Sequence, residues 1–252
     1  MNAIEIKCLN YKYQNKIIFN NLDLKIKQGD FVTVLGSSGS GKTTLINLII
    51  NKLKNNDHIK INNKKIAVIN NENCNYLYKT VLDKLTFALE KENKINDEIS
   101  KEIMQFANYF QIYKILNKNI SNLSKGELIL INFVATLINK SQIIIIDDCM
   151  KYLSNNYLNR IVKYLQTINN KDNITIINFT KNSEEIFYGK TTTFIIDKQI
   201  IFADNIINNL DVFKKANITI PFMIELSDKL KAYELIDSLV IDMNEMINQI
   251  WK

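Results

Sequence analysis

The chain contains short stretches in which hydrophobic and polar residues alternate or in which all residues are apolar. These short stretches predict strands, and the longer segments between them, with apolar residues at helical spacing, predict helices. The predicted strands are 4–8, 17–26, 31–35, 58–61, 65–70, 143–147 and 173–179, with a hairpin over 192–203. The predicted helices are 43–54, 78–92, 97–116, 124–140 and 154–168, and the pattern after about 204 is helical to the end. Strands that alternate with helices indicate an α/β fold with a parallel sheet.

The final segment carries two local signals of its own. Pro221 suits the first turn of a helix. An apolar stripe is expected on the last helix, formed by Leu235, Leu239, Met243, Met246 and Ile250. This stripe either covers the chain's own sheet or contacts a second subunit.

Three of only six glycines fall within six residues, at Gly36, Gly39 and Gly41. The stretch matches the phosphate-binding pattern G-x-x-x-x-G-K-[ST], and it lies between a predicted strand and a predicted helix. Successive backbone N–H groups of such a loop curl around an anion at the start of the helix. Lys42 is expected to reach the β- and γ-phosphates, and the Thr43 hydroxyl to bind Mg²⁺. The nucleotide-binding residues predicted here are Gly36, Ser37, Ser38, Gly39, Ser40, Gly41, Lys42, Thr43 and Thr44.

Two carboxylates follow the most apolar predicted strand. Four successive isoleucines over 143–146 indicate a central parallel strand that is buried on both faces. Asp147 at its carboxyl end is placed to hold Mg²⁺, and Asp148 to orient or deprotonate an attacking water.

Composition and charge exclude several classes of protein. A chain with 46% hydrophobic residues and one proline is not a disordered or collagen-like protein. The net charge of +6 comes from dispersed lysines with no base-reading module, which argues against a nucleic-acid partner. Three scattered cysteines favour reduced thiols, and no basic-then-apolar leader indicates secretion. No apolar run approaches the ~18 residues that cross a bilayer.

The segment Leu123–Glu127 begins a predicted helix about twenty residues before the acidic strand end. Ser124 and Glu127 match a capping box, which is the simple structural interpretation. The segment, Ser124-Lys125-Gly126-Glu127 above all, also resembles the LSGGQ signature of ATP-binding-cassette (ABC) proteins. A helix of ~16 residues spans ~24 Å, so Ser124 is expected to cap the γ-phosphate held by a second cassette. The expected assembly is a head-to-tail dimer with two nucleotides between the subunits.

The resemblance to ABC proteins extends over residues 4 to about 203. It implies a P-loop ATPase domain over 1–203 with a RecA-like core sheet, antiparallel N-terminal strands and a helical subdomain inserted at about 72–140, followed by a helical extension over 204–252. Tyr13 matches the aromatic residue that stacks on adenine, and a core tyrosine is the alternative. Asn71 stands in the place of the Q-loop glutamine, and Lys181 in that of the switch histidine.

The tail resembles the C-terminal extension of the ATPase subunits of energy-coupling factor (ECF) transporters, through Asp211-Val212-Phe213 and Ile218–Phe222. The resemblance implies an importer of vitamins or metal ions that uses ATP and Mg²⁺. Its implied partners are a second ABC ATPase, with a heterodimer favoured, a polytopic membrane coupling protein and a substrate-binding membrane subunit. It further implies a peripheral location on the cytoplasmic side of the cell membrane, with residues 71–80 near the groove that receives the partner's helices.

Several positions depart from the family's catalytic pattern. Asp148 replaces a glutamate, so its carboxylate sits about one methylene short, and misplacement on the order of 1 Å can cost ~10²-fold in rate. Lys181 is a lysine where a histidine is usual, so it can steady phosphate charge but is a poor proton carrier. Lys125 and Glu127 stand where a glycine and a glutamine are usual. We therefore expect nucleotide binding with slow hydrolysis at the chain's own site. The alternatives are a nucleotide-gated subunit that hydrolyses almost no ATP, and the ATPase of another ABC transporter.

Overall fold

The computed structural model describes residues 1–252 except 51–55, 63–64, 72–76, 91–95, 203–208 and 252. The chain forms two compact units that are interleaved in sequence. Unit 1 comprises residues 1–4, 26–31 and 61–178, and unit 2 comprises residues 5–25, 32–60 and 179–252. Strands and helices occur in both units, which confirms the predicted α/β class.

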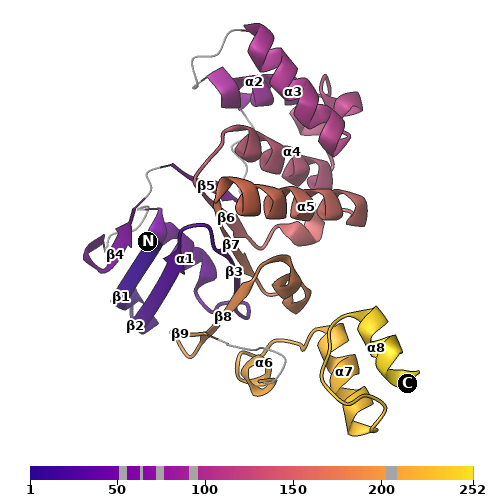
Figure 1. The fold of residues 1–252 in the computed structure, drawn as a ribbon. Coiled ribbons are helices and arrows are strands. Elements are labelled where there is room, and N and C mark those ends of the chain that lie inside the picture. The colour runs from indigo at the N-terminus through magenta and orange to yellow at the C-terminus, as the bar shows by residue number, and fades with distance from the viewer. Residues whose placement is uncertain (51–55, 63–64, 72–76, 91–95, 203–208, 252) are drawn as a thin grey trace. The chain divides into compact units, whose positions relative to one another are not determined.

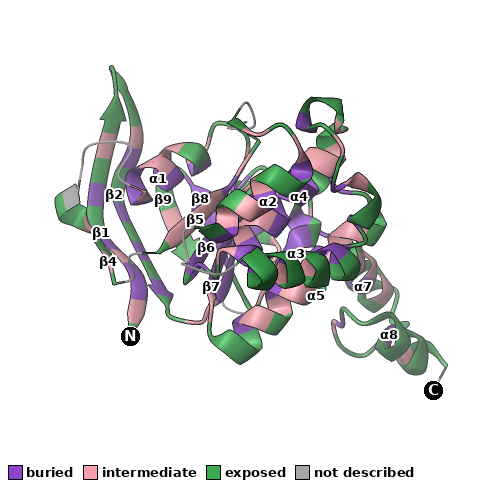
Figure 2. Ribbon diagram, turned by 90° about the horizontal axis from the view of Figure 1, so that it is seen from above, coloured by how far each residue is buried: buried purple, intermediate pink, exposed green. Residues whose placement is uncertain are grey.

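The described part of unit 1 contains a pair of parallel strands, residues 175–178 of a further strand, and several helices (Figure 1). Strand β5 (Ile66–Ile69) pairs in parallel with β6 (Ile143–Asp147), with Ile69 opposite Ile146. Residues 143–146 are fully buried, as their apolar run predicted. The helices are α2 (Val81–Glu90), α3 (Asn96–Phe110), α4 (Lys125–Ile138) and α5 (Asn155–Asp172). Figure 2 shows exposed residues along the outer side of α5. Ile161 and Leu165 of this helix are buried.

Unit 2 contains the glycine-rich stretch between a strand and a helix. Strand β3 (Phe31–Leu35) pairs in parallel with β8 (Thr191–Ile196), which pairs in antiparallel fashion with β9 (Gln199–Phe202). The predicted hairpin is therefore present. Strand β7 (Thr175–Thr180) enters the unit with its last two residues. Most of β1 (Asn2–Tyr13) and β2 (Lys16–Lys27) belong here and form a sheet with β4 (Ile59–Ile61) in the order β2-β1-β4. Helix α1 runs from Lys42 to Ile49.

Short 3-10 helices complete the described elements. They are Asn56–His58, Tyr113–Ile115, Ile120–Asn122, Met150–Tyr152 and Ser183–Tyr188. No helix among the described residues is long and apolar enough to cross a membrane.

Helix boundaries differ from the prediction where local backbone geometry intervenes. The helix predicted over 97–116 ends at Phe110, because Gln111 adopts a left-handed φ of 57° and Ile112 N–H bonds back to Ala107 O. Helix α2 begins at Val81 and not at residue 78 as predicted. Thr80 and Asp83 cap it, because the backbone N–H of each donates to the side chain of the other. Helix α1 ends at Ile49, and residues 51–55 of the predicted 43–54 helix lie outside the described residues.

The single stripe predicted for the last helix is wrong. The tail forms α6 (Asp211–Lys215), α7 (Phe222–Ala232) and α8 (Met243–Ile250), so Leu235 and Leu239 lie in the loop before α8. Glu234 has a left-handed φ of 58°, which breaks the helical path that the spacing suggested. Met246 is buried with Ile236 and Val240 in a small core that the tail makes for itself, with α7 residues around it.

Candidate nucleotide-binding site

The glycine-rich loop joins β3 to α1 within unit 2. Gly39 and Gly41 have φ values of 81° and 102°, a region that disfavours side chains. Gly41 is the N-cap of α1 and offers no side-chain cap, so the first N–H groups of the helix depend on other acceptors. At the other end of the loop, Gly36 N–H donates to Thr180 O at 3.1 Å. The loop is therefore held by Thr180 at one end and leads directly into the start of α1 at the other.

Lys42 folds back over the loop that precedes it. Its ammonium donates to Gly36 O at 2.6 Å and to Ser37 O at 2.9 Å, and the residue is 9% exposed. A cation held by loop carbonyls beside the start of a helix is suited to bind a polyphosphate. The next residue, Thr43, is exposed at the start of α1.

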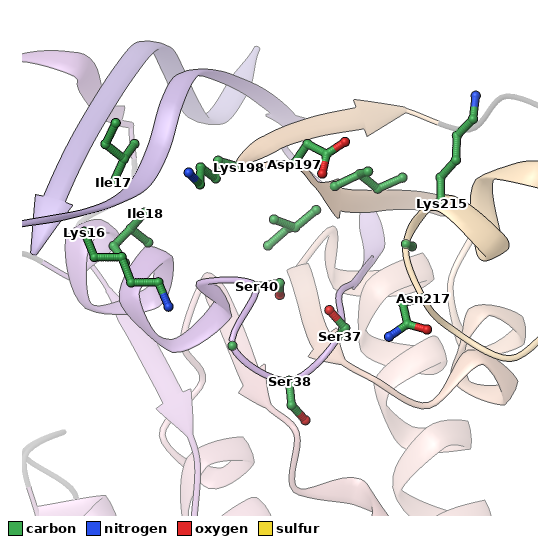
Figure 3. Close-up of a pocket in the computed structure, with 14 residues that line it drawn as sticks. Lys16, Ile17, Ile18, Ser37, Ser38, Ser40, Asp197, Lys198, Lys215 and Asn217 are labelled. Atoms are coloured by element: carbon green, nitrogen blue, oxygen red, sulfur yellow. The ribbon is translucent and has the colours of Figure 1, made fainter.

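A pocket of about 260 Å³ lies beside this loop (Figure 3). Its lining comes from the loop, the start of β2, the β8–β9 turn and the end of α6: Lys16, Ile17, Ile18, Ser37, Ser38, Gly39, Ser40, Ile195, Ile196, Asp197, Lys198, Lys215, Ala216 and Asn217. The lining has three lysines and one aspartate, a balance that suits an anion. Sequence reasoning missed the contribution of the tail, since it depends on how α6 packs.

Two predicted site residues stand at strand ends in this unit. Tyr13 ends β1 with 59% of its surface exposed, which argues against the alternative of a core tyrosine, and it is absent from the pocket lining. Lys181 is exposed and directly follows Thr180, the residue whose carbonyl holds Gly36. Adenine stacking by Tyr13 and a switch role for Lys181 stay predictions.

In unit 1, parallel pairing brings the other predicted residues to one edge of the sheet. Asn71 follows β5 and is exposed, whereas Asp147 and Asp148 end and follow β6 and are half-buried. The Cys149 thiol contacts Ile69 O at 3.6 Å and ties the two strand ends together. Parallel pairing thus puts Asn71 and the acidic pair after the same ends of neighbouring strands, and their catalytic roles stay predictions.

Asp148 is already engaged by a neighbour that the sequence did not single out. Its carboxylate forms an ion pair with Lys151 and its backbone is left-handed, with φ of 45°. Lys151 and Lys125 lie 5.2 and 3.6 Å from the centre of the Tyr152 ring. The hydrogen bond from Lys125 lowers the pKa of the Tyr152 hydroxyl, against a smaller opposing effect of burial. The i,i+3 spacing of Asp148 and Lys151 was the one signal available in the sequence.

The signature-like segment forms the predicted capping box. Ser124 Oγ accepts from Glu127 N–H at 3.2 Å, and the Glu127 carboxylate accepts from Ser124 N–H at 2.7 Å and from the Lys118 ammonium at 3.1 Å. The hydrogen bond from the Ser124 backbone is the main cause of the lowered pKa of Glu127. A Cβ on Gly126 would lie 2.7 Å from Tyr152 O, so only glycine allows this close approach.

The donor chemistry fits the predicted magnesium ion. The Thr43 hydroxyl and the Asp147 carboxylate are both oxygen donors of the kind that Mg²⁺ prefers. Thr43 is exposed on the loop of unit 2, and Asp147 is half-buried at the strand end of unit 1. Shared binding of one ion by these residues stays a prediction.

The sequence is similar to a family of known proteins. A model of the ABC transporter family matches residues 19–151. The ECF transporter ATP-binding protein EcfA of Aster yellows witches'-broom phytoplasma is 29% identical over 75% of this chain and 78% of its own length. EcfA1 of Mycoplasmopsis synoviae is 25% identical over 85% of this chain and 87% of its own length. The spermidine/putrescine import ATP-binding protein PotA of Spiroplasma citri is also 25% identical, over 73% of this chain and 56% of its own length.

Solved structures agree on the fold. CbiO1 from Clostridium perfringens, part of the ABC transporter complex CbiONQ, superimposes with a TM-score of 0.71 and 21% identity over 90% of this chain and 99% of its own. The ATP-binding cassette MJ0796, a dimer bound to ADP and Pi, gives a TM-score of 0.68 and 22% identity over 78% of this chain and 96% of its own. The fold is therefore that of an ABC ATPase cassette.

Proposed function

Because this chain belongs to the ABC transporter family and is an ATPase subunit of that family, we propose that it energises an ECF-type importer of vitamins or metal ions. The observation that carries the proposal is the Gly36–Gly41 loop with the Lys42 ammonium closed over it. That loop is the ATP-binding element of the family, and its complete pattern supports tight nucleotide binding.

The ECF assignment within the family is supported by the tail and by the named relatives. The proteins named EcfA and EcfA1 align over three quarters or more of this chain. The tail begins with α6 and α7 at the segment whose pattern resembles the ECF extension. The likeness to PotA favours a second candidate, the ATPase of a polyamine-type ABC importer.

The chain's own residues divide the reaction into two tasks. Lys42 and the N–H groups of α1 bind the polyphosphate, and Thr43 with Asp147 would hold Mg²⁺, which neutralises developing charge on the phosphates when bound. Asp148 would orient the attacking water, with Asn71 and Lys181 beside the transferred phosphate. The ion pair between Asp148 and Lys151 occupies the carboxylate and supports slow hydrolysis at this site. If turnover were almost absent, the chain would act as a nucleotide-gated subunit instead.

Slow hydrolysis is the reason to propose a heterodimer. The partner would be a second, more complete ABC ATPase, and Ser124 at the start of α4 would cap the nucleotide that this partner holds. A membrane coupling protein and a substrate-binding membrane subunit complete the proposed complex, which makes this chain peripheral on the cytoplasmic side. The apolar residues Met243, Ile247, Ile250 and Trp251, all at least 39% exposed, give α8 an outer face suited to a subunit contact.

A titration with a fluorescent ATP analogue and Mg²⁺ tests nucleotide binding. We expect saturable binding by the wild-type chain and about a hundredfold weaker binding by Lys42→Ala, because the variant loses an ammonium whose hydrogen bonding to a charged phosphate contributes up to ~3 kcal/mol. Lys25→Ala, at an exposed lysine of β2, is the matched control and should bind as the wild type does. Absence of saturable binding at millimolar ligand would overturn the proposal.

Co-expression tests the type of transporter. The chain is produced with a second ATPase and a coupling protein of an ECF system, or with the membrane subunits of a polyamine importer, and the complexes are purified through a tag on the membrane protein. Retention by the ECF set alone supports the proposal. Retention by the polyamine set alone favours the second candidate.

A further inference from the structure

The tail packs directly on the strand that leads into the glycine loop. Leu35, the residue before Gly36, belongs to a buried apolar cluster. The same cluster contains Val212 and Phe213 of α6 and Ala216, which follows that helix. The Phe213 ring meets the Phe194 ring of β8 edge to face at 5.1 Å. Residues within unit 2 that are far apart in sequence therefore fix α6 beside the loop.

Asn217 ends α6 in a conformation that sets the direction of its side chain. Its φ is 53°, a left-handed value that asparagine tolerates better than most residues. Its N–H donates to Lys214 O at 3.0 Å, and Ile218 N–H donates to Phe213 O at 3.0 Å. These bonds close the helix end, so Asn217 is held by the backbone on both sides.

The side chain of Asn217 lies in the pocket next to the glycine loop. Asn217 and Ser37 both line this pocket, and Figure 3 shows the Lys215 ammonium pointing away from the loop. The amide carries both donors and an acceptor, so it can bond to phosphate or ribose oxygens. The tail thus supplies a polar group to the side of the pocket that faces the loop.

We propose that Asn217 is a nucleotide-contacting residue, through which the C-terminal segment takes part in ATP binding by this chain. The proposal rests on the proposed function, since the ligand is the nucleotide that the glycine loop holds. It extends that function, because occupancy of the site then stabilises the end of α6. Phe222 N–H also bonds to the Glu184 carboxylate at 2.7 Å, so α7 is fastened to the segment that follows Lys181. We therefore expect nucleotide binding to affect the tail through these contacts.

Two substitutions at Asn217 test the contact in the full chain. Asn217→Gly keeps the left-handed backbone and removes the amide, and we expect about tenfold weaker binding of fluorescent Mg-ATP, the loss of a hydrogen bond to a charged group. Asn217→Asp puts a carboxylate beside the phosphates, and we expect a larger loss, on the order of thirtyfold, that shrinks at high salt. Asn173→Asp is the matched control: Asn173 also ends a helix with a left-handed φ, of 55°, outside this pocket, and its substitution should leave affinity unchanged.

A second measurement needs no substitution. Hydrogen exchange of the wild-type chain is compared with and without Mg-ATP, and amides over 211–218 should exchange more slowly with nucleotide. If wild-type binding is saturable but both Asn217 variants match it and 211–218 shows no protection, this inference is wrong while the proposed function stands. If the wild-type chain binds no ATP, the proposed function itself fails.

Discussion

The glycine loop and the signature-like segment both precede a helix, but they present that helix start in opposite ways. The loop before α1 ends at Gly41, which supplies no side-chain cap, so no capping side chain stands between an anion and the start of α1. The segment before α4 fills the same positions with its own side chains, Ser124 and Glu127. Backbone geometry would therefore carry the proposed nucleotide binding in the first region, whereas side chains that already have partners occupy the second.

This difference explains which departures from the family pattern matter. A loop that acts through N–H groups tolerates changes among its serines but not at glycines with positive φ. The role proposed for Asp148 depends on the reach of its carboxylate, which a shorter side chain and an ion pair with Lys151 both reduce. Binding should therefore persist in this chain while hydrolysis is slow.

The largest expected effect separates two glycines of the same loop. A Cβ on Gly41 would lie 2.8 Å from the buried Phe19 ring, whereas one on Gly39 meets nothing within 4 Å. Both residues have positive φ, so alanine costs ~1–2 kcal/mol at each. We expect Gly41→Ala to lose a further ~1–3 kcal/mol from overpacking, measured as the free energy of unfolding in urea. Equal losses at both positions would show that backbone conformation alone governs the loop.

The next effect concerns the rate of hydrolysis. Asp148→Glu lengthens the carboxylate, and Lys151→Met removes its ion-pair partner. We expect each substitution to raise the rate of phosphate release from bound Mg-ATP by about tenfold. The reason is that displacing a catalytic group by a fraction of an ångström can lower the reaction rate by roughly that factor. Asp148→Asn is the control and should lower the rate. If neither variant is faster than the wild type, the engagement of Asp148 is not what limits turnover.

The sequence predicted the two regions unequally, for physical reasons. The glycine loop and the capping box are local patterns in which spacing dictates geometry, and both are present as predicted. The apolar stripe predicted for the last helix was wrong because Glu234 has a left-handed φ, which the spacing of apolar residues does not reveal. The approach of Asn217 to the loop and the stacking of Lys125 on Tyr152 depend on packing between distant segments. Such contacts carry no signature in a single sequence.

A smaller effect tests whether Ser124 is a structural cap. Ser124 and Ser154 are N-caps with nearly the same backbone, φ and ψ being −62° and 160° against −66° and 155°. Only Ser124 makes a side-chain cap hydrogen bond. Ser124→Ala should therefore lower the free energy of unfolding by ~1 kcal/mol, and Ser154→Ala by much less. If Ser124→Ala leaves stability unchanged but lowers hydrolysis by a complex with the partner ATPase, the hydroxyl serves the nucleotide instead.

The smallest effect is a dependence of stability on pH near α4. The hydrogen bond from the Ser124 backbone holds the pKa of Glu127 below its usual 4.5. A carboxyl whose pKa is lower in the folded state contributes stability above its unfolded pKa, and that contribution is lost as the pH falls through the folded pKa. Glu127→Gln should therefore remove a few tenths of a kcal/mol at pH 6 and a smaller amount at pH 3, as measured by urea unfolding at both values. Glu98→Gln, in the first turn of α3, is the matched control. A Glu127→Gln deficit that is the same at both pH values would show that the side chain stabilises α4 through packing and not through its charge.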